Sequence, residues 1–151
     1  MILAATIGPA PAGRRLEAVK DATMHSAKVV IVDDDEDIRR VLARIVQSVG
    51  LATEAYPSAE AFITGANPPS IACLLLDHQL PGMKGLELLE RLSSDKAAFP
   101  VFLISGAHDA RTATRARELG AVVVDKPFDA RELGRRILAL VSSKKTPSDL
   151  S

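Results

Sequence analysis

Charged and hydroxyl side chains directly follow several short apolar runs of this sequence. The residues that could do chemistry are Asp33, Asp34, Asp77, Ser105 and Lys126. Asp77 ends the run IACLLL, where hydrophobic packing gives no reason for a charge. Carboxylates that lie close together raise one another's pKa unless a cation compensates them. Gathered at one place, these groups could hold a divalent cation and a phosphoryl group.

Asp77 is the candidate nucleophile of such a site. A hard cation, with Mg²⁺ as the usual candidate, accepts carboxylate and carbonyl oxygens, and Lys126 would add a second positive charge. Two cations beside a carboxylate keep it ionised and neutralise the oxygens of a phosphoryl group, which it can attack to form an acyl phosphate. Taken singly, an aspartate after a strand is more often a helix cap, so the interpretation depends on the residues meeting.

The elements that must bring these residues together are strands and helices in alternation. Short apolar runs at 29–32, 52–56, 71–76, 101–104 and 121–124 alternate with segments of helical spacing at 38–49, 58–66, 86–92, 110–120 and 129–141. Strands of this kind predict a parallel sheet covered on both faces, an α/β three-layer sandwich. The carboxyl ends of its strands form the edge where sites of such folds lie.

Composition sets further limits on the function. A length of 151 residues predicts one domain, and equal numbers of basic and acidic residues, 19 of each, give no overall attraction to nucleic acid or membrane. Cys73 is the one cysteine of the sequence, so no internal disulfide can form, which fits a reducing cytoplasmic compartment. No apolar run approaches the roughly 20 residues of a membrane-spanning helix, and we expect a soluble protein.

The periodic pattern also predicts domain limits. We expect residues 1–26 to be a flexible N-terminal extension that is not necessarily native, with Met24 as an alternative start. Residues 27–141 form the predicted domain, and 142–151 form a flexible C-terminal tail. That tail is too short for a DNA-binding helix-turn-helix, and the sequence therefore predicts a domain that acts alone.

Four motifs in order resemble the receiver domain of two-component response regulators. They are VIVDDDEDIRRVL, LLLDHQLPGMKGLELL, FLISGAHD and VVDKPFD. The resemblance covers about residues 27–141 and implies a five-stranded parallel sheet in the flavodoxin-like order 2-1-3-4-5, which is the order found in receivers. It implies a phosphoacceptor domain rather than an enzyme, with self-catalysed phosphotransfer and autodephosphorylation alone.

The resemblance also implies a role for each site residue. Asp77 would be the phosphoacceptor, and Ser105 and Lys126 would contact the phosphoryl group, with a cis peptide between Lys126 and Pro127. The Mg²⁺ ligands would be Asp33, Asp34, Asp77 and the backbone carbonyl of Gln79. Asp35 would begin a helix rather than bind metal.

Partners follow from the same resemblance. The phosphoryl donor would be a sensor histidine kinase or a histidine phosphotransfer domain, and the output would be contact with a downstream protein, without DNA or membrane. Val123 stands where the family often has an aromatic switch residue, and the side chains of Gln79 and Ala107 would tune dephosphorylation. His78 and His108 match no zinc spacing, and we expect both to be exposed loop residues.

Two other functions remain open at this point. A haloacid-dehalogenase-type phosphatase would use Asp33 as nucleophile and Asp35 as acid, but it leaves the Asp77 segment without a role. A pseudo-receiver would bind partners without being phosphorylated. Turnover of phosphomonoesters would support the phosphatase, and stoichiometric labelling of Asp77 would support the receiver. A pseudo-receiver would be indicated by missing site residues, and none of the main ones is missing.

Overall fold

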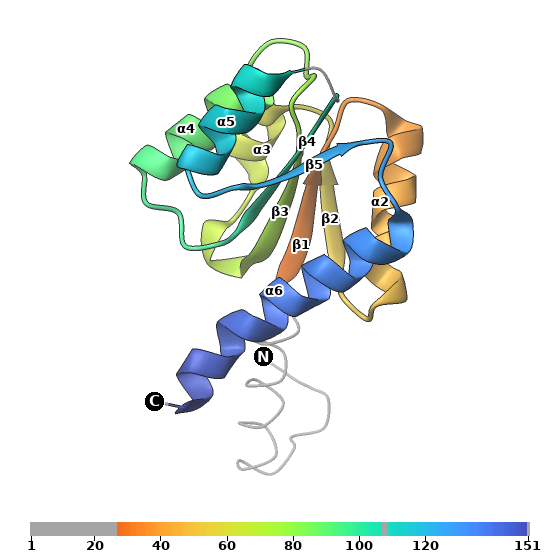
Figure 1. Cartoon of the computed structure of the whole chain (residues 1–151), viewed down its shortest axis with the longest axis vertical. Coiled ribbons are helices and arrows are strands. Elements are labelled where there is room, and N and C mark those ends of the chain that lie inside the picture. The colour runs from red at the N-terminus through yellow and green to blue at the C-terminus, as the bar shows by residue number, and fades with distance from the viewer. Residues whose placement is uncertain (1–26, 107–108, 151) are drawn as a thin grey trace, which may run out of the picture.

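The computed structural model describes residues 27–106 and 109–150, with side chains described as far as 142. Its strands are β1 (Lys28–Val32), β2 (Thr53–Tyr56), β3 (Ile71–Asp77), β4 (Val101–Gly106) and β5 (Val122–Lys126). Its α-helices are α2 (Glu36–Ser48), α3 (Ala59–Gly65), α4 (Gly85–Ser94), α5 (Ala110–Glu118) and α6 (Ala130–Leu150). Strands and helices alternate along the described chain (Figure 1).

The strands form one parallel sheet in the order β2-β1-β3-β4-β5. This confirms the predicted fold class and strand order. β3 lies at the centre of the sheet, and its last residue, Asp77, is in register with Ile104 of β4. The register therefore brings the ends of β1, β3, β4 and β5 to the same edge of the sheet.

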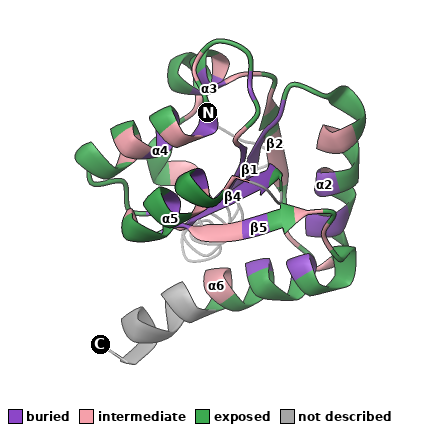
Figure 2. Ribbon diagram, turned by 45° about the horizontal axis from the view of Figure 1, so that its top comes forward, coloured by how far each residue is buried: buried purple, intermediate pink, exposed green. Residues whose placement is uncertain are grey.

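Helices cover both faces of the sheet, with α3, α4 and α5 on one side and α2 and α6 on the other (Figure 1). Each face has its own apolar cluster. Phe62, Leu74, Leu88 and Leu103 lie in the first, and Ile31, Leu75, Phe102 and Ile137 lie in the second. In Figure 2 the buried residues lie along β1 and β4 and on parts of the helices, whereas β5 is largely intermediate or exposed.

The strands extend further toward their carboxyl ends than the apolar runs indicate. Asp77 is the last residue of β3, Ser105 lies within β4, and Lys126 ends β5. Ladder pairing continues to these polar residues, with Ser105 beside Asp125 and Gly106 beside Lys126. The hydrogen bonds of a parallel ladder thus fix the backbone of the candidate site residues themselves.

Other predicted limits differ as well. A 3₁₀-helix (Pro68–Ser70) occupies the loop expected before β3. α6 runs across the domain limit expected at residue 141 and ends at Leu150, and the domain limits themselves stay predictions. The predicted extension 1–26, with Met24, lies outside the described residues. In the described part of the chain, no helix combines the length and apolar character needed to cross a membrane.

Candidate functional site

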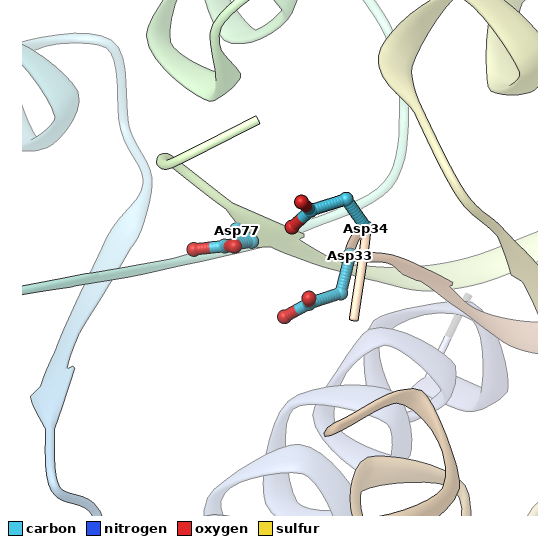
Figure 3. Close-up of side chains that lie close together, drawn as sticks. All are labelled: Asp33, Asp34 and Asp77. Carbon is cyan, nitrogen blue, oxygen red and sulfur yellow. The ribbon is translucent and has the colours of Figure 1, made fainter. Parts of the chain in front are cut away.

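Three carboxylates meet at the carboxyl ends of β1 and β3. Each of Asp33, Asp34 and Asp77 offers an oxygen, and these oxygens lie within 4.8 Å of one another (Figure 3). Asp33 and Asp77 are almost completely buried, at 1% and 3% exposure, whereas Asp34 is exposed. The sheet therefore places two desolvated carboxylates beside a solvated one.

The Asp33 carboxyl is only half satisfied. Its Oδ1 accepts a hydrogen bond from the backbone N–H of Asp35 at 2.9 Å, while its buried Oδ2 has no hydrogen-bond partner. Burial raises the pKa of Asp33 from 3.8 to about 6; the negative charges of Asp77 and Asp34 add to the rise, and the Asp35 N–H and the Lys126 charge oppose it. A buried acceptor without a partner is costly, and a cation would supply the missing partner.

The first turn of α2 fixes the backbone around this carboxyl. Asp35 is the N-cap residue, and its side chain accepts from the N–H groups of Asp37 and Ile38. Arg39 donates from Nη1 to the backbone carbonyl of Asp33 at 2.7 Å. Asp35 is thus a helix cap, as predicted. Asp33 is fixed by hydrogen bonds from the Asp35 N–H and from Arg39.

Lys126 approaches Asp77 from the other side. Its Nζ donates to Asp77 Oδ1 at 3.2 Å, and its side chain stays 35% exposed. The predicted cis peptide between Lys126 and Pro127 is present. Asp77 therefore lies between one ammonium group and two carboxylates. The three carboxylates outnumber this single positive charge, and a bound cation would balance the excess.

Two other predicted site residues have different placements. The backbone N–H of Gln79 donates to Asp77 Oδ1 at 3.2 Å, so the chain turns back over the carboxylate after β3. Ser105 is buried at the end of β4, but its hydroxyl donates weakly to the carbonyl of Gly106 at 3.4 Å rather than to Asp77. The roles of the Gln79 carbonyl and of the Ser105 hydroxyl stay predictions.

Gly85 lets α4 begin directly against the end of β3. A Cβ at this position would lie 2.4 Å from the backbone oxygen of Asp77 and 2.7 Å from Cα of His78. Both neighbours are backbone atoms, which cannot move aside cheaply. The glycine is thus required by the close approach of the helix to the Asp77 segment.

The prediction for His78 is wrong. Its side chain is 12% exposed, and its Nδ1 accepts from the backbone N–H of Leu86 at 3.3 Å. Its Nε2 lies 3.4 Å from Thr112 Oγ1 and 3.5 Å from Asp109 Oδ2. The sequence shows that His78 follows a strand, but not that two helix starts lie around its ring. His108 and Ala107 lie outside the described residues.

The donor set fits a divalent cation. Carboxylate oxygens are the ligands that Mg²⁺ prefers, and a half-exposed arrangement lets the ion keep some of its water. Burial leaves Oδ2 of Asp33 without a hydrogen-bond partner and raises the pKa of that carboxyl, and the charges of Asp77 and Asp34 add to the rise, so a cation at this place would be stabilising. Asp33, Asp34 and Asp77 could therefore hold the ion.

Sequence comparison agrees with this arrangement. The family model of the response regulator receiver domain matches residues 29–138, most of the 151-residue chain. The chain belongs to the response regulator receiver family. This membership excludes the haloacid-dehalogenase-type phosphatase, whose proposed acid, Asp35, is used as a helix cap.

Curated relatives are similar over the same region. The transcriptional regulatory protein FixJ of Azorhizobium caulinodans is 38% identical over 105 residues, which are 69% of this chain and 50% of FixJ. The response regulator protein TodT of Pseudomonas putida is 36% identical over 106 residues, 70% of this chain and 47% of TodT. The chain thus spans about half the length of the curated relatives that it matches.

Solved receivers share the fold. A crystal structure of FixJ-N matches with a TM-score of 0.66 and 34% identity, covering 77% of this chain and 93% of that one. A receiver domain protein from Methanospirillum hungatei matches with a TM-score of 0.72 and 23% identity, covering 80% and 97% of the two chains. The second match shows the fold alone.

These relatives correct the predicted partners. The predicted partners were a kinase or phosphotransfer domain and a protein target, without DNA. That exclusion of DNA is wrong, because relatives such as FixJ are transcriptional regulatory proteins. That the domain acts alone stays a prediction. The prediction depended on how few residues follow 141. The length of a tail carries no physical information about the output to which a receiver is coupled.

Proposed function

We propose that Asp77 accepts a phosphoryl group from a phosphohistidine and that the resulting acyl phosphate is the signal. One observation carries this proposal: the buried Asp77 carboxylate lies 3.2 Å from the Lys126 ammonium and beside two further carboxylates that could hold a cation. A carboxylate oxygen of Asp77 attacks phosphorus and forms a P–O bond. The P–N bond to the donor imidazole breaks, and its electron pair returns to the ring nitrogen.

Lys126 supplies positive charge in this step. Its ammonium lies 3.2 Å from Asp77 Oδ1, where it can neutralise an oxygen of the incoming phosphoryl group. The N–H of Gln79, which donates to Asp77 Oδ1, holds one carboxylate oxygen so that the other is free to attack. Ser105, one residue beyond the strand position opposite Asp77, would donate its hydroxyl to the phosphoryl group once that group is present.

Mg²⁺ is part of the proposal, with Asp33, Asp34, Asp77 and the Gln79 carbonyl as its protein ligands. When bound, the ion supplies positive charge for the phosphoryl oxygens. Asp33 would be one of the residues that hold the ion, whose positive charge would oppose the rise of the Asp33 pKa caused by burial. Asp34, which is exposed, lets the ion remain in contact with solvent.

Hydrolysis of the acyl phosphate on Asp77 would end the signal. Attack of water on phosphorus breaks the P–O bond to Asp77, releases inorganic phosphate and restores the carboxylate, so the chain hydrolyses its own acyl phosphate and no other substrate. The proposal includes the cytoplasmic location expected from the sequence. Phosphorylation adds negative charge at a buried position, and that charge is available to bias the neighbouring elements.

The test is labelling by a small phosphodonor. The chain is incubated with acetyl phosphate and Mg²⁺ and run on a phosphate-affinity gel, together with Asp77→Asn and Asp125→Asn. Asp125 is an exposed carboxylate on the same sheet edge, so its variant is a matched control for charge. We expect a retarded band for the wild type and Asp125→Asn and none for Asp77→Asn, and we expect EDTA to abolish the band.

Two results would contradict the proposal. No retarded band in the wild type would favour the pseudo-receiver, which binds partners without phosphorylation. An equal band in the wild type and Asp77→Asn would place the label on another residue. Intact mass spectrometry distinguishes these cases, because one phosphoryl group adds about 80 Da to the chain.

A further inference from the structure

The ring of His78 joins three segments that are far apart in the sequence. The residue directly follows Asp77, its Nδ1 accepts from Leu86 N–H in the first turn of α4, and its Nε2 lies against Asp109 and Thr112 at the start of α5. Helices α4 and α5 lie on the same face of the sheet (Figure 1). The ring is mostly buried, so water competes little for these contacts.

The contacts have a definite direction. A nitrogen that accepts from Leu86 cannot carry a hydrogen, so the neutral ring has its hydrogen on Nε2 and donates toward α5. Thr112 in turn donates its hydroxyl to Asp109 Oδ2 at 2.6 Å, and Asp109 Oδ1 accepts from Thr112 N–H at 3.0 Å. The result is a chain of hydrogen bonds from α4 through the ring to the N-cap of α5.

The backbone of His78 belongs to the Asp77 end of the sheet. Its N–H donates to the carbonyl of Ile104 at 2.9 Å, and its carbonyl accepts from Gly85 N–H at 3.1 Å. A movement of the peptide after Asp77 therefore moves the ring. The two Nε2 contacts, at 3.4 and 3.5 Å, are long for hydrogen bonds, so a small displacement is enough to tighten or break them.

We propose that His78 is a positioning residue that transmits the state of Asp77 to the N-terminus of α5 through Thr112 and Asp109. This inference rests on the proposed phosphorylation of Asp77. Val123 has no aromatic ring and cannot act as an aromatic switch residue. The hydrogen bonds through His78 would connect Asp77 to α5 without an aromatic switch.

The test compares variants that remove hydrogen bonds while keeping volume. His78→Phe retains a ring without nitrogens, and Thr112→Val retains the shape of a buried side chain without its hydroxyl. Thr114→Val, on the exposed side of the same helix, is the matched control. Each full chain is treated with acetyl phosphate and Mg²⁺, labelling is read on the gel, and amide chemical shifts of residues 110–118 are compared before and after labelling.

We expect His78→Phe and Thr112→Val to be labelled like the wild type but to lose most of the shift change in α5. Thr114→Val should keep it. The double variant should show no further loss, since one break interrupts the chain as well as two. Shift changes within β3 and at Gln79 should persist in all of them, which shows that the variants are folded and respond locally.

The inference is overturned if α5 responds as in the wild type in either His78→Phe or Thr112→Val. It is also overturned if the wild type itself is labelled without any shift change in α5, in which case the proposed phosphorylation stands. Failure to label the wild type contradicts the proposed function and this inference together. The gel and the spectra thus separate the two failures.

Discussion

β3 and β5 both deliver a charged residue to the site, but they do so in different environments. β3 is paired on both sides, and six of its seven residues are buried. β5 is an edge strand of the described sheet, and one of its five residues, Val124, is buried. Asp77 is accordingly 3% exposed, whereas the Lys126 side chain is 35% exposed.

The difference separates the fixed and the adjustable parts of the site. A carboxylate at the end of a central strand has its position set by packing on both faces and by ladder bonds on both sides. A lysine at the end of an edge strand has a flexible stem and contact with water. The structure thus fixes the position of Asp77, the proposed phosphorylation site, and leaves the Lys126 side chain free to move toward a charge placed there.

The largest expected effect tests the packing of the two strands. Leu75→Ala on β3 removes a fully buried side chain, and we expect the free energy of unfolding to fall by about 2–5 kcal/mol. Val122→Ala on β5, where the side chain is partly exposed, should cost about 1 kcal/mol. Urea denaturation measures both, and equal losses would contradict the contrast between centre and edge.

The next test removes the charge contributed by the edge strand. Lys126→Gln keeps a polar side chain without the ammonium group, and we expect labelling of Asp77 by acetyl phosphate to slow by roughly 100-fold. Lys84→Gln is the control, because Lys84 donates to the carbonyl of Leu80 in the loop after β3. A similar slowing in both variants would mean that general charge, rather than the Lys126 position, matters.

A smaller effect should appear as a pH dependence from the buried carboxyl of β1. The pKa of Asp33 is about 6 in the folded chain, and its ordinary value of 3.8 applies to the unfolded chain. Between pH 3.8 and pH 6 the folded chain therefore binds more protons than the unfolded chain. In EDTA, the free energy of unfolding should therefore fall as the pH rises from 4 to 6, by on the order of 2 kcal/mol.

The matched variant for this effect is Asp33→Asn, which cannot ionise. It should lack this part of the pH dependence and be more stable than the wild type at pH 7.5 in EDTA, with little difference at pH 4. Denaturation curves of both chains across this pH range provide the measurement. Stability of the wild type that rises with pH while the variant stays flat would show that the buried carboxyl has a partner.

Much of this arrangement follows from sequence patterns alone. Five apolar runs and the helical spacing between them predict the sheet, and parallel pairing then requires Asp33, Asp77 and Lys126 to share an edge. The capping of α6 by Asp129, which accepts from Glu132 N–H, also follows from the residue types. Local periodicity is sufficient here because each residue's position is fixed by its own strand or helix.

Contacts between distant segments could not be predicted in this way. The ring of His78 meets α5 because α4 and α5 lie side by side, and its spacing in the sequence carries no sign of that. The 3.4 Å bond from Ser105 to its neighbour, in place of a contact with Asp77, depends on a side-chain rotamer. The output partners were the least predictable, because they depend on surfaces rather than on periodicity.

The strand register limits how the length of the chain can vary near the site. Asp77 is level with Ile104, and Ile104 with Val124, so Lys126 stands two residues, about 7 Å, beyond the row of Asp77. An even offset keeps Lys126 on the face of Val124, which is the face that Leu75 and Asp77 share. Insertion or deletion of one residue between Val124 and Lys126 would turn the lysine to the opposite face. Changes in length are therefore tolerable before β5 but not within its last three residues.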